Sequence, residues 1–192
     1  YFFMAGFSLG SMQAINYNLD QESENIFHVD GLFLISHVYD TNQSALILEK
    51  PLQSKLYLSV IVNKLVHALK KNNYVEGELK EAIHSKTLCE FDDKFTAKTL
   101  GLKDHEEYYA KVQIYHLVPK LKVPTLIIGS DDDPFTEKKY QPIKEVSESQ
   151  DVALVTYPEG GHVSFLTGMD GRKSIVDYIG VDFFDTIISK LK

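Results

Sequence analysis

The chain has 192 residues, 44% of them apolar, and a formal net charge of -7 at pH 7. These values describe one ordinary globular domain whose core is large enough to hold a cleft, and the acidic balance argues against a nucleic-acid partner. The single cysteine, Cys89, excludes a disulfide within these residues and favours an intracellular location. No apolar run approaches the roughly 20 residues that a membrane-spanning helix needs.

The first predicted elements alternate between strand and helix. Residues 2–7 form a short apolar run rich in aromatic side chains, which predicts a buried strand. Residues 11–22 can continue as a helix. A second apolar run at residues 31–36 is typical of a strand that is buried on both faces of a sheet.

The middle of the chain predicts helices. Residues 52–72 have helical spacing, with an apolar side made of Leu56, Val60, Ile61, Leu65 and Leu69. Residues 75–100 are polar and predict short helical pieces. Asp104 is a candidate N-cap, and Glu107 would complete a capping box for a helix through Tyr109.

The last third of the chain returns to alternating strands and helices. Residues 123–129 and 152–157 predict two more strands, and residues 174–191 predict a helix that Gly180 weakens. Buried strands separated by helices indicate an α/β fold with a mostly parallel sheet and helices on both faces. The long interval between the second and third strands predicts an inserted helical cap at about residues 39–122.

A serine motif stands between the first strand and the first helix. Gly6-Phe7-Ser8-Leu9-Gly10 has the pattern G-x-S-x-G, in which the serine occupies a sharp, strained turn. Side chains at Gly6 and Gly10 are expected to collide with the flanking strand and helix. The turn would lift the Ser8 hydroxyl clear of the sheet and aim the Leu9 N–H at an oxyanion. The alternative is a small-residue turn that packs a helix on a strand.

Three consecutive aspartates follow the third predicted strand. Catalytic carboxylates in open parallel sheets lie at the carboxyl ends of strands, which makes this run a candidate source of a triad acid. Asp133 is preferred because it directly precedes Pro134-Phe135, and Asp132 is the alternative because a one-residue shift in the loop would exchange the two. The remaining aspartates would serve a solvated turn or cap the next helix.

A candidate base follows the fourth predicted strand. His162 comes directly after Gly160-Gly161 and so lies on a loop that could carry its ring to a serine. The order Ser8, Asp133, His162 is nucleophile, acid, base. The other histidines have no comparable setting and are predicted to be surface or lid residues: His28, His37, His67, His84, His105 and His116.

With these positions the chain resembles the α/β-hydrolase superfamily, and within it the esterase branch of YheT-type hydrolases, phospholipases and acylglycerol lipases. The resemblance implies Ser8 as nucleophile, Asp133 as acid and His162 as base, because the second Asp of the Asp-Asp-Pro element is the usual triad member. The matching segments are Gly6-Phe7-Ser8-Leu9-Gly10, Cys89-Glu90-Phe91-Asp92, Tyr108-Tyr109, Val123-Pro124-Thr125-Leu126, Asp132-Asp133-Pro134-Phe135 and Gly160-Gly161-His162.

The chain departs from that family pattern at two residues and at its front. Ser11 stands where a second glycine is typical, and Gln113 stands where a serine commonly follows the tyrosine pair. The resemblance also implies about four strands before the serine strand, with a loop that supplies a second oxyanion donor. We therefore expect an upstream segment or a partner chain to complete the sheet, and residues 1–192 alone to be inactive.

The sequence thus predicts a serine hydrolase of carboxylic esters, acting on a lipid or medium-chain acyl ester through an acyl-enzyme. No cofactor and no metal ion is expected. The rival prediction is a catalytically silent α/β-hydrolase domain that serves as an accessory or scaffold subunit. A third prediction is an acyltransferase that uses the same three residues.

Overall fold

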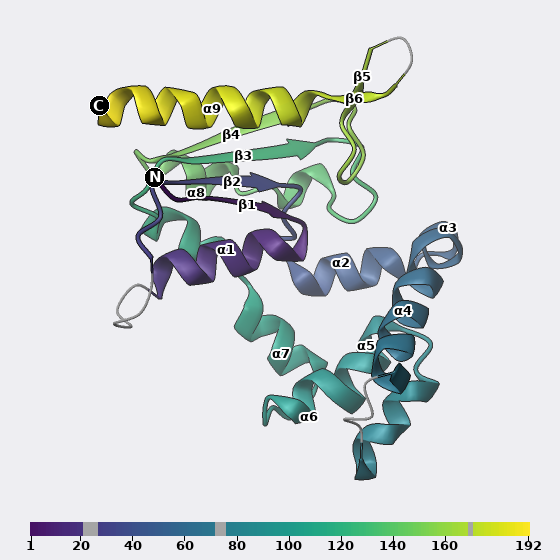
Figure 1. The fold of residues 1–192 in the computed structure, drawn as a ribbon. Helices are drawn as coiled ribbons and strands as arrows, with labels where there is room; N and C mark the ends of the chain where they lie inside the picture. The colour runs from purple at the N-terminus through teal and green to yellow at the C-terminus, as the bar shows by residue number, and fades with distance from the viewer. Residues whose placement is uncertain (21–26, 72–75, 169–170) are drawn as a thin grey trace. The chain divides into compact units, whose positions relative to one another are not determined.

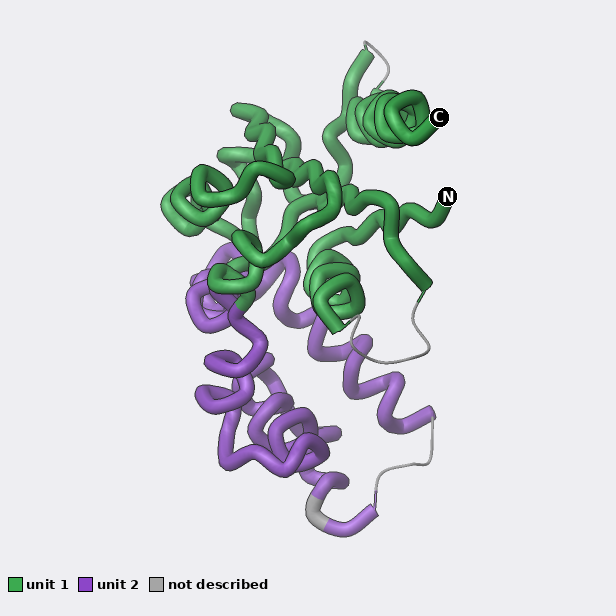
Figure 2. Tube along the Cα trace, turned by 90° about the vertical axis from the view of Figure 1, so that its left-hand side faces the viewer, with its two compact units in different colours: residues 1–39, 114–192 green, residues 40–113 purple. Residues whose placement is uncertain are grey.

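A computed structural model describes residues 1–20, 27–71, 76–168 and 171–192. The chain forms two compact units, one of Tyr1–Tyr39 with Ile114–Lys192 and one of Asp40–Gln113 (Figure 2). The first unit contains a parallel sheet, and the elements described in the second are all helical. None of the helices in the described ranges is long and apolar enough to cross a bilayer.

Four parallel strands form the sheet, and their spatial order is their order in the chain (Figure 1). They are β1 (Phe3–Phe7), β2 (Gly31–Ile35), β3 (Thr125–Ser130) and β4 (Val152–Tyr157). All four strands were predicted, with bounds that differ by at most two residues. Because every pair is parallel, the carboxyl ends of all four strands lie at one edge of the sheet.

The two faces of the sheet carry separate apolar clusters. Alternate side chains of a strand point to opposite faces, and β2 shows this directly: Leu32 and Leu34 belong to one cluster, whereas Phe33 and Ile35 belong to the other. Helices α1 (Leu9–Leu19) and α8 (Ile143–Ser147) cover the first face, and α9 (Ile175–Leu191) covers the second (Figure 1). The predicted α/β fold with helices on both faces is confirmed.

Several predicted boundaries in the sheet unit need correction. Helix α1 begins at Leu9 instead of residue 11, and residues 21–22 of the predicted helix lie outside the described residues. Residues 114–122, predicted as part of the inserted cap, belong to the sheet unit. These residues contain a 3₁₀ helix, η4 (Tyr115–Lys120). Three side chains of the segment are buried in the core of the sheet unit: Ile114, Val118 and Leu121.

The last part of the chain contains a feature that the sequence did not predict. β5 (Leu166–Thr167) and β6 (Lys173–Ser174) form a small antiparallel pair just before α9. Helix α9 then runs unbroken through Gly180, although that glycine was predicted to weaken it. A Cβ at Gly180 would lie 2.8 Å from the Phe33 ring, so the glycine lets the helix pack closely on the sheet.

The helical unit is built from short segments. Its α-helices are α2 (Thr41–Leu48), α3 (Pro51–Gln53), α4 (Ser59–Lys71), α5 (Leu88–Phe91), α6 (Ala97–Thr99) and α7 (His105–Val112). Two π-helical segments, η1 (Ser54–Leu58) and η3 (Asp92–Thr96), and a 3₁₀ segment, η2 (Gly77–His84), connect them. The prediction of helical pieces between residues 75 and 100 is confirmed for the described residues. Its placement as a cap over the site stays a prediction.

The predicted apolar side of residues 52–72 coincides only in part with the buried side. Leu58, Val62 and Val66 are the buried residues, whereas Leu56 is 51% exposed and Val60 is 50% exposed. Ile61, Leu65 and Leu69 of the predicted side are half-buried, and the buried Val62 and Val66 each directly follow one of them in the chain. The π-helical turn of η1 also rotates the residues before it relative to an α-helical wheel.

Two segments that carried the family resemblance contact each other in the helical unit. The Tyr109 hydroxyl donates to Asp92 Oδ2 at 2.8 Å, and Thr96 Oγ1 donates to Asp92 Oδ1 at 2.6 Å. Burial raises the pKa of Asp92. The predicted N-cap is also confirmed, because Asp104 accepts from the Glu107 N–H at 3.0 Å. The bond from Tyr109 to Asp92 ties α7 to the π-helical segment η3.

Candidate active site

Ser8 occupies a strained turn between β1 and α1. Its backbone has φ 51° and ψ -122°, a combination that residues with a Cβ rarely adopt. The turn is fixed from both sides, since the Ser8 N–H donates to Ile35 O at 2.9 Å and the Ser11 N–H donates to Ser8 O at 3.0 Å. The strand, the strained serine and the helix occur in the order that the sequence predicted.

Of the two glycines in the serine motif, only one is needed for space. A Cβ at Gly6 would lie 2.6 Å from Ser11 Cα and 2.7 Å from Gly10 O, both backbone atoms that cannot easily give way. A Cβ at Gly10 would meet nothing within 4 Å. The predicted collision is therefore present at Gly6, and the predicted collision at Gly10 was wrong because that position of α1 faces open space.

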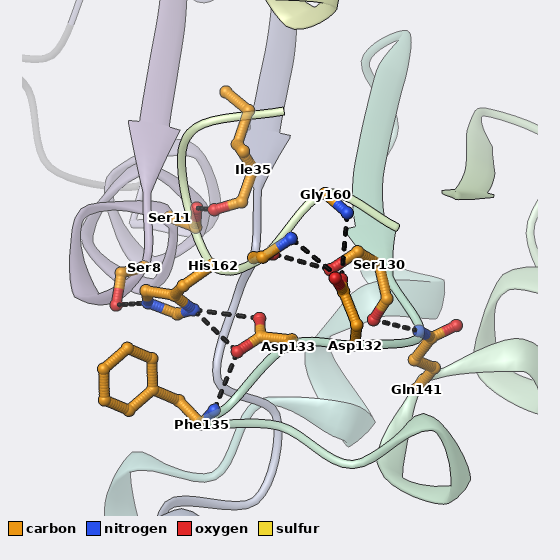
Figure 3. A network of polar contacts seen from close by, with 11 residues as sticks. Ser8, Ser11, Ile35, Ser130, Asp132, Asp133, Phe135, Gln141, Gly160 and His162 are labelled. Carbon is orange, nitrogen blue, oxygen red and sulfur yellow. Dashed lines mark hydrogen bonds and ion pairs between the residues drawn. The ribbon is translucent and has the colours of Figure 1, made fainter. Parts of the chain in front are cut away.

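Ser11, the departure from the family pattern, is fully buried against the same turn. Its Oγ donates to Gly6 O at 2.7 Å and lies 3.4 Å from Ile35 O (Figure 3). The serine hydroxyl therefore links the start of α1 to the carbonyls of β1 and β2. Ser11 thus adds a hydrogen bond on the buried side of the turn, whereas the Ser8 hydroxyl bonds His162 instead.

The structure brings Ser8, Asp133 and His162 together at the carboxyl edge of the sheet (Figure 3). His162 Nε2 lies 2.8 Å from Ser8 Oγ, and His162 Nδ1 lies 2.9 Å from Asp133 Oδ2 and 3.0 Å from Asp133 Oδ1. A carboxylate can only accept, so Nδ1 carries the proton and Nε2 is left to accept from the serine hydroxyl. This arrangement aligns a hydroxyl, an imidazole and a carboxylate in one continuous line of hydrogen bonds.

The three consecutive aspartates take three separate positions. Asp131 Oδ2 pairs with Lys138 Nζ at 2.6 Å. Asp132 Oδ1 accepts from the two glycine N–H groups that precede the histidine. Only Asp133 bonds the histidine ring, and its Oδ1 also accepts from the Phe135 N–H at 2.8 Å. Of the two candidates for the acid, Asp133 is therefore the one that lies within hydrogen-bond distance of the His162 ring.

One histidine prediction was wrong. His37, expected at the surface or in a lid, is only 2% exposed and lies just after β2. Burial lowers the pKa of His37 to about 3, so its ring is neutral at physiological pH. Neither ring nitrogen makes a hydrogen bond of normal geometry within the described part of the chain. The ring lines a small cavity that it shares with Asp133 and Thr136.

The side chains around Ser8 and His162 are largely apolar. The Phe135 ring meets the His162 ring edge to face, with centroids 4.3 Å apart. Leu9, next to the serine, is 57% exposed, and Val163, next to the histidine, is 44% exposed. Leu9 is also the first residue of α1, where a backbone N–H has no partner inside the helix. Its predicted role as an oxyanion donor remains a prediction.

The comparisons with known proteins agree on an enzyme family. No family model matches the chain. Phospholipase ABHD3 of Mus musculus is 27% identical over 175 residues, which cover 90% of this chain and 42% of that protein. A monoacylglycerol lipase of Saccharomyces cerevisiae is 26% identical over 184 residues, covering 90% and 40%. The putative esterase YheT of Escherichia coli is 30% identical over 169 residues, covering 85% and 48%.

Solved structures share the fold at lower identity. A meta-cleavage product hydrolase of Pseudomonas fluorescens aligns with a TM-score of 0.54 and 15% identity, over 96% of this chain and 64% of that one. An esterase of Pyrococcus furiosus aligns with a TM-score of 0.52 and 12% identity, over 96% and 52%. This chain spans less than half the length of the three curated relatives described above. The chain is thus similar in sequence to esterases and lipases, and its fold is that of an α/β-hydrolase.

Proposed function

We propose that this protein hydrolyses carboxylic esters of lipid or medium-chain acyl groups, with Ser8 as nucleophile, His162 as general base and Asp133 as the acid that orients it. One observation carries the proposal: the unbroken line of hydrogen bonds from Ser8 Oγ through both nitrogens of His162 to the Asp133 carboxylate. A nucleophile, a base and an orienting carboxylate within hydrogen-bond reach are the geometric signature of acyl transfer through a serine.

In the proposed reaction, Ser8 Oγ attacks the ester carbonyl while His162 Nε2 takes the hydroxyl proton. Asp133 keeps the proton of the neutral ring on Nδ1, and it stabilises the positive charge that the ring gains. His162 then gives its proton to the leaving alcohol, and an acyl-Ser8 ester remains. Water, deprotonated by the same ring, hydrolyses this ester and restores the serine. No cofactor enters any of these steps.

The Leu9 N–H is the proposed oxyanion donor. It lies on the residue directly after the nucleophile, at the first turn of α1, where the helix leaves its N–H groups without internal partners. The partial positive charge of a helix N-terminus would further favour a negative oxygen there. A single oxyanion donor of this kind is worth about 100- to 1000-fold in rate.

The apolar surroundings support an acyl substrate. The Phe135 ring lies against the ring of His162, and Leu9 and Val163, the neighbours of Ser8 and His162 in the chain, are exposed apolar residues, which suits an alkyl chain. The names of the relatives, a phospholipase and a monoacylglycerol lipase, agree with an ester whose acyl group comes from a lipid. We therefore propose the acyl side of the substrate as apolar, of medium length or longer.

A fluorophosphonate probe tests the proposal, because it reacts covalently only with an activated serine. We expect the purified full-length protein to be labelled at Ser8, and labelling to disappear in Ser8→Ala and to fall strongly in His162→Ala. Ser59→Ala removes an exposed serine of the helical unit and serves as the matched control. Folded protein that fails to label at Ser8 would contradict the proposal and favour a silent accessory subunit.

A further inference from the structure

The loop that carries His162 has no regular structure to hold it. It connects β4 to β5, and His162 directly follows the pair Gly160 and Gly161, the latter at φ 62°. Glycines give a loop more backbone freedom than any other residue. A base on such a loop can meet the serine only if other groups fix the backbone directly before it.

Two side chains at the end of β3 fix that backbone (Figure 3). Asp132 Oδ1 accepts from the Gly160 N–H at 2.9 Å and from the Gly161 N–H at 2.8 Å. Ser130 Oγ donates to Gly161 O at 2.5 Å. Three of the four backbone polar groups just before His162 are therefore bonded by two side chains of one neighbouring segment.

The bonds from Asp132 are of the strong, charge-assisted kind. Hydrogen bonds from the Gly161 N–H and then the Gly160 N–H hold the pKa of Asp132 below its usual range, so the carboxylate is ionised near neutral pH. An ionised acceptor on backbone N–H groups bonds more strongly than a neutral one. The hydrogen bonds of Asp132 go to the loop backbone and not to the His162 ring or Ser8. Its effect on the base is therefore indirect, through the position of the loop.

We propose that Asp132 is a positioning residue, whose carboxylate clamps the Gly160-Gly161 turn so that the His162 ring stands between Ser8 and Asp133. The consequence for catalysis rests on the proposed function, but the clamp itself does not. In this arrangement Asp133 orients the ring of His162, and Asp132 fixes the backbone of the loop that carries it.

Asp131 provides a matched control for this proposal. It carries the same charge one residue earlier, but its carboxylate pairs with Lys138, a surface contact on its own side of the loop. Asp131→Ala and Asp132→Ala therefore remove the same group from adjacent positions, and only the second removes the clamp. Asp132→Asn keeps an oxygen that can accept both glycine N–H groups, so it is the conservative variant.

The kinetic test compares these variants on a short-chain nitrophenyl ester. We expect Asp132→Ala to lower kcat by about 10- to 100-fold, the loss typical of a misplaced catalytic group, with KM changed less than about twofold. Asp132→Asn should recover most of kcat, and Asp131→Ala should stay near the wild-type value. An Asp132→Asn variant as inactive as Asp133→Asn would overturn the proposal, because Asp132 would then act as the acid.

Amide hydrogen exchange tests the clamp without any need for activity. We expect the Gly160 and Gly161 amides to exchange at least about tenfold faster in Asp132→Ala than in the wild type, and Asp131→Ala to leave them unchanged. Unchanged exchange in Asp132→Ala would overturn the proposal. Clamp-dependent protection in a protein that hydrolyses no ester would contradict the proposed function alone. Should Asp132→Ala fail to fold, Asp132→Glu displaces the carboxylate by one methylene and gives the same comparison.

Discussion

Replacing Gly6 by alanine tests whether the turn around Ser8 depends on close backbone packing. The new Cβ would lie 2.6 Å from Ser11 Cα, whereas ordinary contact begins at 3.4 Å, so the two backbones must separate by the difference, about 0.8 Å. The displaced segment carries Ser8. A shift approaching 1 Å in a reacting group lowers the rate by about 100-fold, and overpacking of this kind destabilises a protein by about 1–3 kcal/mol.

The assay measures kcat/KM for a nitrophenyl ester together with the midpoint of urea unfolding. Gly10→Ala is the control, because a Cβ there meets nothing within 4 Å. It should keep its activity within about threefold and gain up to about 1 kcal/mol, since alanine favours a helix over glycine. Equal losses in the two variants would refute the reasoning from space, and so would a fully active Gly6→Ala.

Two further predictions concern stability. The pKa of His37 is about 3 in the folded protein, against 6.5 for a free histidine. Unfolding therefore takes up a proton below pH 6.5, and the free energy of unfolding decreases as the pH is lowered through that range. The loss at pH 5 is about 2 kcal/mol, and His37→Leu should flatten the curve in urea titrations at several pH values; an unchanged slope would contradict the buried neutral ring. Ser11→Ala, which removes the 2.7 Å bond to Gly6 O, should lower the free energy of unfolding by about 1 kcal/mol, and an unchanged midpoint would show that the bond adds nothing.

The sequence predicted the sheet because its strands are unambiguous apolar runs. The buried β2, with every residue from Gly31 to Ile35 inside, has the continuous apolar pattern that only a doubly covered strand shows. The strands β5 and β6 were not predicted, because two residues are too few to show an alternation of apolar and polar side chains. An element that buries more apolar surface has a clearer apolar pattern in the sequence, and it is therefore easier to predict.

The site was predictable in its members and only partly in their roles. Ser8 lies after a strand with a glycine two residues away on each side, and His162 follows a strand and directly succeeds a glycine; both are local signals that need no knowledge of the fold. The run of aspartates has a weaker signal, because only the position of Asp133 before Pro134-Phe135 distinguishes it from Asp132, and a one-residue shift in the loop would exchange the two. His37 offered a clue that was missed: it follows β2 as closely as the aspartates follow β3, so it lies at the same edge of the sheet.

The strained backbone of Ser8 also bears on the stability of the protein. At φ 51° a residue with a side chain holds a conformation that glycine adopts freely, and such strain amounts to about 1–3 kcal/mol. A Ser8→Gly protein would lose the hydroxyl and gain heat resistance in the same step. The same substitution would therefore measure the strain, as a rise in the unfolding temperature, and test the proposed nucleophile, as a loss of labelling by the fluorophosphonate.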